Sequence, residues 1–315
     1  MNNDPLIDAL LRSERSAIAK AITMVENEAG IFRDILGAVY PAIGHAYRIG
    51  ITGPPGAGKS TLSYQLTRLI RGQDLKVGIV AIDPTSPFTG GAVLGDRLRM
   101  ADLTMDRGVY IRSMASRGSL GGLAATTTQV ADILDAAGYD IIIYETVGVG
   151  QVELDIADAA DTTLVMLVPE GGDIIQGLKA GLMEIGDIFV LNKYDRPGAD
   201  RMQKDIEYVL HLKGPSEGWS PKVMPSVANR GEKTDTIWVE INRHREFLQS
   251  HDLLQKKRTA RLKKHLKRLI RAEMEQRFWT PAREAFLTDY LKADNPDVSP
   301  YDLAGRMVEE LINKH

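Results

Sequence analysis

The 315-residue sequence has no cysteine, no long apolar run and no excess of basic residues. Without cysteine the chain can form neither disulfides nor thiolate metal sites, which is compatible with a reducing compartment. No apolar run approaches the length that crosses a bilayer, and the first residues lack the basic and apolar regions of a signal peptide. The formal net charge of −3 argues against a protein built mainly to bind nucleic acid or an anionic membrane. We therefore expect a soluble, cytoplasmic protein with no membrane or nucleic-acid partner.

Seven short apolar runs, most of them separated by helical stretches, indicate an α/β fold. They lie at residues 49–52, 77–82, 109–111, 141–144, 163–168, 188–191 and 223–224. Runs without strict alternation are typical of strands that are buried on both faces, so we predict a mostly parallel sheet covered by helices on both sides. In such folds ligands bind beyond the carboxyl ends of the strands.

Helical periodicity flanks this core. Apolar spacing predicts one helix over residues 5–28 and a short one over 31–39. After the last strand, the pattern predicts helices over 234–247, 253–278, 281–292 and 299–313. We accordingly divide the chain into a helical extension (1–45), a nucleotide-binding domain (46–248) and a helical arm (249–315). The 253–278 helix is rich in lysine and arginine, but no aromatic stacking series accompanies them, which favours a packing or dimer seam over a nucleic-acid site.

The first strand runs into Gly-Pro-Pro-Gly-Ala-Gly-Lys-Ser-Thr, which matches the P-loop pattern G-x-x-x-x-G-K-[S/T]. A wrapped phosphate leaves no room for Cβ atoms, and successive backbone N–H groups at a helix N-terminus form an anion nest. Lys59 should reach the β- and γ-phosphates, and the Ser60 hydroxyl should ligate Mg²⁺. The predicted nucleotide-binding residues of this loop are Gly53, Pro54, Pro55, Gly56, Ala57, Gly58, Lys59, Ser60 and Thr61.

Acidic residues end two further strands, Asp83 after the second and Glu145 after the fourth. Carboxylates placed there can hold Mg²⁺ or its waters, so we predict Asp83 and Glu145 as metal ligands and, together with Lys59, as the catalytic group. Gly148 is predicted to contact the γ-phosphate. Small GTPases place a glutamine directly after that glycine, whereas this chain has Val149. Slow hydrolysis without a partner is the expected consequence.

The loop after the fourth strand also contains Gln151, which replaces the missing glutamine only if the loop rearranges. After the fifth strand, Asp173 and Lys179 lie in a glycine-rich segment and could contact nucleotide or partner. An ordinary capped helix start explains the same two residues equally well.

Asn192-Lys193-Tyr-Asp195 follows the sixth apolar run and matches the base-reading motif of GTP-binding proteins. The Asp195 carboxylate can accept hydrogen bonds from guanine N1–H and the 2-amino group, and adenine offers no such pair of donors. A site that would leave a buried group unpaired in this way can reject the wrong ligand by roughly 10⁴–10⁵-fold. The next strand leads to Val227 and Ala228, where GTPases place a backbone contact to the guanine oxygen.

These motifs together resemble the methylmalonyl-CoA mutase-associated GTPases of the MeaB/ArgK type. The resemblance covers nearly the whole chain, and its most specific part is Glu-Thr-Val-Gly-Val-Gly-Gln at 145–151. Further matching segments are Asp-Pro-Thr-Ser-Pro at 83–87, Gly-Gly-Ala-Val-Leu-Gly-Asp-Arg-Leu-Arg-Met at 90–100 and Arg-Gly-Ser-Leu-Gly-Gly at 117–122.

The resemblance implies a P-loop NTPase fold of the SIMIBI type and a homodimer built through the C-terminal arm. It implies a GTP-hydrolysing chaperone that loads and protects an adenosylcobalamin-dependent acyl-CoA mutase, with the mutase accelerating hydrolysis. It also implies that Asp96 belongs to the metal site and that Arg97 and Arg99 belong to a switch, as do Asp173 and Lys179. GTP or GDP with Mg²⁺ is the implied ligand.

Three other functions are considered. A nickel-insertion GTPase shares the fold but usually has His- or Cys-rich segments, and the six histidines here are scattered. A signal-recognition-type GTPase needs a methionine-rich RNA-binding module, and the 11 methionines do not cluster. A transport-associated kinase would use ATP and a second substrate pocket, which Asn192-Lys193-x-Asp195 disfavours.

Overall fold

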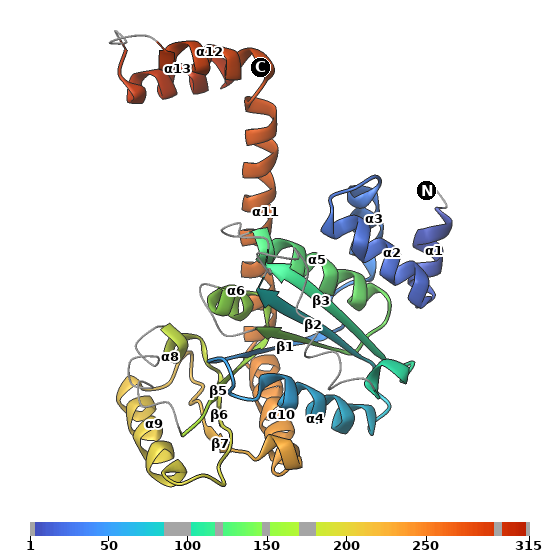
Figure 1. Ribbon diagram of the computed structural model, residues 1–315, viewed down its shortest axis with the longest axis vertical. Helices are drawn as coiled ribbons and strands as arrows, with labels where there is room; N and C mark the ends of the chain where they lie inside the picture. Colours follow the sequence, from blue (N-terminus) through green and yellow to red (C-terminus); the bar gives the residue numbers. More distant parts are fainter. Residues whose placement is uncertain are drawn as a thin grey trace. The chain divides into compact units, whose positions relative to one another are not determined.

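The computed structural model describes residues 4–84, 102–116, 122–146, 152–169, 181–292 and 298–312. The chain forms two compact units, Met1–Arg258 and Thr259–His315. The first unit contains a sheet with its covering helices, and the second contains most of a long helix and two shorter ones (Figure 1).

One seven-stranded sheet forms the centre of the first unit, in the order β3-β2-β4-β1-β5-β6-β7. Its strands are β1 (Tyr47–Thr52), β2 (Val77–Pro84), β3 (Val109–Ser116), β4 (Ile141–Thr146), β5 (Thr162–Leu167), β6 (Ile188–Leu191) and β7 (Val223–Pro225). Neighbouring strands pair in parallel. The predicted α/β fold and parallel sheet are therefore confirmed, and each of the seven apolar runs forms a strand.

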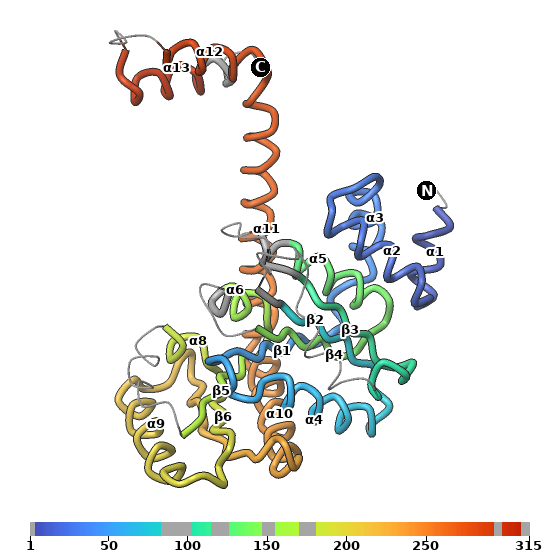
Figure 2. The backbone as a smooth tube through the Cα atoms, viewed as in Figure 1, coloured from blue at the N-terminus to red at the C-terminus, as the bar shows by residue number. Residues whose placement is uncertain are grey.

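Helices cover both faces of this sheet (Figures 1 and 2). Helices α4 (Lys59–Arg71) and α10 (Thr234–Ser250) pack on one face, where Ile49 and Ile51 of β1 are fully buried. The opposite face packs against α5 (Gly122–Ala136) and α6 (Val152–Ala159), and further along against α8 (Met183–Ile185) and α9 (Ala199–Lys213). The largely apolar, buried strands separate these two helical layers, as is typical of a parallel sheet.

The N-terminal segment forms three helices, α1 (Pro5–Leu11), α2 (Arg15–Glu26) and α3 (Phe32–Val39), which pack into the same core as α5. The prediction of one helix over residues 5–28 is wrong. Ser13 has a left-handed φ of 64°, which breaks the helix, and its hydroxyl donates to the carbonyl of Ala137. The apolar periodicity runs through the break because both helices face the same core. The short helix predicted over 31–39 is confirmed.

Helix α11 (Leu253–Phe278) begins in the first unit and continues into the second, which also contains α12 (Pro281–Lys292) and α13 (Pro300–Ile312). Apolar side chains are more than one-third exposed along α11, at Leu262, Leu266, Leu269, Ile270 and Met274. Within the described part of the chain, no helix combines the length and apolar character needed to cross a bilayer.

Candidate functional site

The turn between β1 and α4 has the backbone that a phosphate-binding loop needs. Gly53, Gly56 and Gly58 have φ values of 134°, 73° and 94°, which side-chain-bearing residues rarely adopt. A Cβ at Gly53 would lie 2.2 Å from the carbonyl oxygen of Met166, and one at Gly58 would lie 2.2 Å from the amide nitrogen of Asn192. Two of these glycines are therefore required by close packing as well as by conformation.

Lys59 opens helix α4 with its side chain folded over this turn. The ammonium donates to the carbonyl oxygens of Gly53 and Pro54, at 2.8 Å each, and the residue is only 6% exposed. A buried lysine held against the inside of an N-terminal helix turn concentrates positive charge where the backbone N–H groups already attract anions.

Ser60 and Glu145 meet at the same edge of the sheet, where the Ser60 hydroxyl donates to the Glu145 carboxylate. Ser60 belongs to the first turn of α4, and Glu145 is a buried residue of β4, paired in register with Ile51 of β1. The hydroxyl and carboxylate oxygens form a hard-donor pair of the kind that Mg²⁺ prefers. Asp83 lies at the end of β2, which pairs with β4, so its backbone reaches the same edge.

The segment after β6 is tied to the P-loop by Asn192. This asparagine is 4% exposed; its amide nitrogen donates to the Ala57 carbonyl at 2.7 Å, and its amide oxygen accepts from the Ala228 N–H at 3.0 Å. One side chain thus joins the P-loop, the segment after β6 and the segment after β7. Lys193 follows with a left-handed φ of 56°, a strained conformation of the kind found at ligand sites.

Asp195 lies at the open side of this junction, with its side chain 38% exposed. The loop that carries it is fixed because Tyr194 N–H donates to the Ser226 carbonyl at 3.0 Å. The Arg230 guanidinium lies 3.7 Å from the Asp195 carboxylate. Sequence reasoning missed Arg230, since no motif marks a residue that meets Asp195 only when two separate loops come together.

The segment predicted to contact the guanine oxygen uses its backbone N–H groups within the protein. Val227 N–H donates to the Glu232 carbonyl at 3.4 Å, and Ala228 N–H donates to Asn192. The predicted guanine contact of Val227 and Ala228 stays a prediction.

Several predicted residues lie outside the described residues, so the structure gives no account of them. They are Asp96, Arg97, Arg99, Gly148, Gln151, Asp173 and Lys179. The predicted residues that the structure does describe lie at the carboxyl edge of the sheet, at the ends of β1, β2, β4, β6 and β7.

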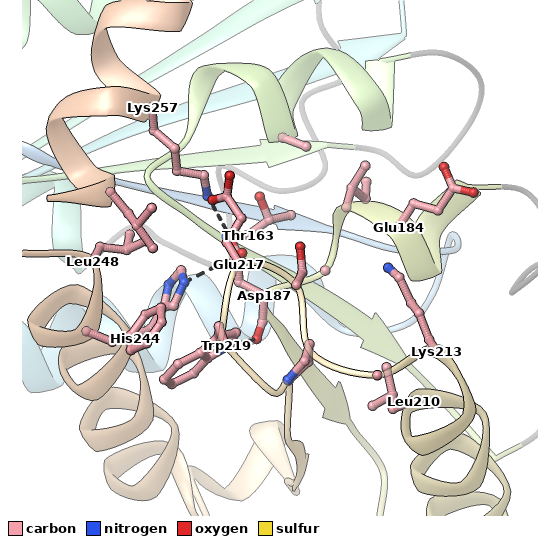
Figure 3. Close-up of a pocket in the computed structure, with 18 of the residues that line it drawn as sticks. Thr163, Glu184, Asp187, Leu210, Lys213, Glu217, Trp219, His244, Leu248 and Lys257 are labelled. Carbon is pink, nitrogen blue, oxygen red and sulfur yellow. Dashed lines mark hydrogen bonds and ion pairs between the residues drawn. The ribbon is translucent and has the colours of Figure 1, made fainter. Parts of the chain in front are cut away.

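A separate cavity of about 210 Å³ opens at the opposite, amino edge (Figure 3). Its polar floor is formed by Asp187, which accepts from the Thr163 N–H at 2.8 Å and lies 3.4 Å from the Lys257 ammonium and 3.6 Å from the His244 ring. Burial lowers the pKa of His244, and the nearby Asp187 carboxylate opposes that shift. Asp187 is thus paired with both Lys257 and His244, which indicates a structural role for these side chains.

Comparison with known proteins gives concordant matches. The family model described as methylmalonyl Co-A mutase-associated GTPase MeaB matches residues 18–283. A Pyrococcus abyssi protein is 45% identical over 98% of this chain and 97% of its own length. GTPase ArgK of Escherichia coli is 38% identical over 75% of this chain and 73% of its own. A solved structure described as LAO/AO transport system kinase has a TM-score of 0.75, 28% identity and 99% coverage of both chains.

Proposed function

Because the chain belongs to the methylmalonyl-CoA mutase-associated GTPase family MeaB and hydrolyses GTP, we propose that it is a chaperone that assists cofactor loading and protection of an adenosylcobalamin-dependent acyl-CoA mutase. The family match over residues 18–283 carries the choice of client. In such a protein GTP hydrolysis controls when the protein binds and releases its client, and the reaction does not serve to produce a metabolite.

Guanine selection is assigned to Asp195. Its carboxylate would accept hydrogen bonds from two guanine donors, and the Arg230 guanidinium lies 3.7 Å from it. Lys193, whose backbone has a left-handed φ of 56°, is proposed to lay its alkyl stem over the base. Asn192 holds this loop against the P-loop, so base and phosphates are bound by one connected structure.

The residues at the carboxyl edge fit a magnesium ion. Ser60 and Glu145 supply adjacent hydroxyl and carboxylate oxygens, and Asp83 and Asp96 are proposed to complete the set. Among the described residues no cluster of three or more His, Cys, Asp or Glu residues is found. When bound, Mg²⁺ would neutralise charge on the β- and γ-phosphate oxygens.

The chain's own residues account for phosphate binding and for slow turnover. Lys59 is proposed to exchange its two carbonyl acceptors for β- and γ-phosphate oxygens, while the P-loop N–H groups hold the remaining oxygens. Val149 cannot orient a water molecule as a glutamine would, so we infer that the client supplies or orders the missing group. Gly148, Gln151, Arg97, Arg99, Asp173 and Lys179 are proposed to transmit nucleotide state to the client.

A cytoplasmic homodimer is part of the proposal. The exposed apolar side chains of α11 form a repeating row that a second copy would bury. We retain the proposed extension at 1–45, nucleotide-binding domain at 46–248 and dimerisation arm at 249–315.

Guanine selection can be tested by changing the base-reading acid. Asp195→Asn exchanges an acceptor for a donor, so it should lose GDP affinity by at least tenfold and gain affinity for xanthosine diphosphate, whose 2-position is a carbonyl. Asp200→Asn is the matched control, because Asp200 contacts the Tyr194 hydroxyl at 2.7 Å on the same segment. Calorimetric titration of each protein with GDP, xanthosine diphosphate and ADP measures its affinity for the three nucleotides. Comparable ADP and GDP affinities in the unaltered protein would remove the guanine assignment.

The client can be tested by mixing. Basal GTP hydrolysis, with Lys59→Ala as the inactive control, should be well below one per second and should rise when an adenosylcobalamin-dependent acyl-CoA mutase is added. A flat response with several such mutases would refute the chaperone proposal and leave the GTPase activity intact.

Two other clients remain as alternatives within the same fold. The solved structure with 28% identity is described as a transport system kinase, and a kinase would phosphorylate a second substrate. Nickel insertion would require a cluster of metal-binding side chains, and the sequence has no cysteine to contribute to one. Production of free phosphate in the absence of any acceptor favours the GTPase over the kinase.

A further inference from the structure

Two buried threonines connect the end of the P-loop strand to the end of the strand that carries Glu145. Thr52 is the last residue of β1 and directly precedes Gly53, and Thr146 is the last residue of β4. The Thr146 hydroxyl donates to the Thr52 hydroxyl at 3.2 Å, and the residues are 2% and 0% exposed. The contact joins positions 94 residues apart in the chain.

This contact lies on the face of the sheet away from the metal-binding pair. Successive strand residues point to opposite faces, so Glu145 meets Ser60 of α4 while Thr146 points toward the α5 and α6 side. Gly50, two residues before Thr52, lies on that second face, where a Cβ would come within 2.7 Å of Ile156 of α6. The threonines therefore lie on the sheet face opposite the Ser60–Glu145 contact.

Consecutive residues thus fix the end of β4 in two directions. Glu145 ties it to the start of α4, and Thr146 ties it to the end of β1. Beyond Thr146 the chain continues to Gly148, and beyond Thr52 it enters the P-loop. In the proposed function Gly148 and the P-loop both contact the γ-phosphate, and a misplacement of about 1 Å can cost roughly 10²-fold in rate.

We propose that Thr52 and Thr146 are positioning residues for GTP hydrolysis, and that their hydrogen bond sets the spacing between the end of β1, which leads to the P-loop, and the end of β4, which leads to Gly148. A hydrogen bond is directional, whereas apolar contact between two side chains is not. The pair acts through the strand ends, so it should influence turnover far more than nucleotide affinity. The inference concerns basal hydrolysis and does not depend on the identity of the client.

The test separates positioning from simple burial of two hydroxyls. Thr52→Val or Thr146→Val alone leaves one buried hydroxyl without its partner and should lower both stability and kcat. In the double valine variant both hydroxyls are gone, so stability should return toward that of the unaltered protein. Its kcat should stay about tenfold low, while the KM for GTP and the Kd for GDP change by less than about twofold.

Two controls complete the design. Thr52→Ser and Thr146→Ser keep the hydroxyls and should retain kcat. Thr162→Val removes a fully buried hydroxyl at the start of β5, where it contacts Tyr47 and His244, and should lower stability without lowering kcat. If the double valine variant recovers kcat together with stability, or if all the valine variants hydrolyse GTP normally, the positioning role is refuted. If a single valine variant fails to fold, the double valine variant and the serine variants still test the positioning role.

Discussion

Replacing Asn192 by alanine should destabilise the nucleotide-free protein by about 2–4 kcal/mol. The side chain makes two buried hydrogen bonds, to the Ala57 carbonyl at 2.7 Å and from the Ala228 N–H at 3.0 Å. Each buried backbone group that loses its partner costs roughly 1–3 kcal/mol, and water entering the vacated space would recover part of this. The same change frees the P-loop from the base-reading loop, so GDP affinity should fall by at least tenfold.

Urea denaturation measures the free energy of unfolding, and calorimetry measures the GDP affinity. Asn242→Ala is a suitable control, because Asn242 also donates one amide hydrogen bond, to the Trp238 carbonyl at 3.0 Å, but lies on α10 and joins no loops. Its loss should cost about 1 kcal/mol or less and leave GDP binding unchanged.

Asn192→Asp is a second variant that tests the same two hydrogen bonds. The carboxylate keeps an acceptor for the Ala228 N–H but places a second oxygen against the Ala57 carbonyl, where a donor is needed. It should therefore be at least as damaging as alanine despite its matching shape. A loss below about 1 kcal/mol for both variants, with GDP affinity within twofold, would show that Asn192 does not hold the loops together.

Three further changes test other parts of the structure. Arg258→Ala should cost about 3 kcal/mol in urea denaturation, because it removes the guanidinium 2.8 Å from the fully buried Asp161 carboxylate; a loss below about 1 kcal/mol would contradict this. Gly58→Ala should weaken GDP binding at least tenfold more than Gly56→Ala, since only the Gly58 Cβ would strike another residue; equal losses would refute the packing argument. His244 has a pKa below its ordinary value of 6.5, because burial disfavours the charged ring, so the unfolded chain binds a proton that the folded protein excludes. Stability should therefore fall as the pH drops below about 6.5, by at most about 1.4 kcal/mol per unit, and His244→Gln should flatten that slope; an unchanged slope would count against it.

Much of the fold followed from local patterns. Seven apolar runs predicted seven strands because residues buried on both faces of a sheet must be apolar all along the strand. The helix over 5–28 failed for a local reason as well: Ser13 adopts a left-handed φ that its residue type does not announce. The apolar periodicity in that segment arises because both helices pack on the same core, so it cannot predict the break between them.

Contacts between distant segments were the part that the sequence could not reveal. The Thr52–Thr146 and Arg230–Asp195 contacts depend on which strands and loops are neighbours. The order of strands is fixed by the packing of whole helices and by the rules of chain crossing, neither of which a motif encodes. The motif that contains Asn192 was recognised from the sequence, but the two partners of its side chain, Ala57 and Ala228, were not.

The strand order explains why affinity and turnover should separate. Strand β1 lies between β4 and β5, and β6 lies next to β5, so the base-reading loop begins two strand spacings, roughly 10 Å, from the P-loop strand. On that side Asn192 spans the gap through its hydrogen bond to Ala57, so we expect its loss to weaken the proposed base and phosphate contacts together. On the other side β4 is the direct neighbour of β1, and Thr52 and Thr146 join only the ends of these two strands. Variants of Asn192 should therefore change both the Kd for GDP and kcat, whereas the double valine variant should change kcat alone. If instead the Asn192 variants changed kcat alone and the double valine variant changed the Kd for GDP, the nucleotide would have to bind across a different set of strand ends.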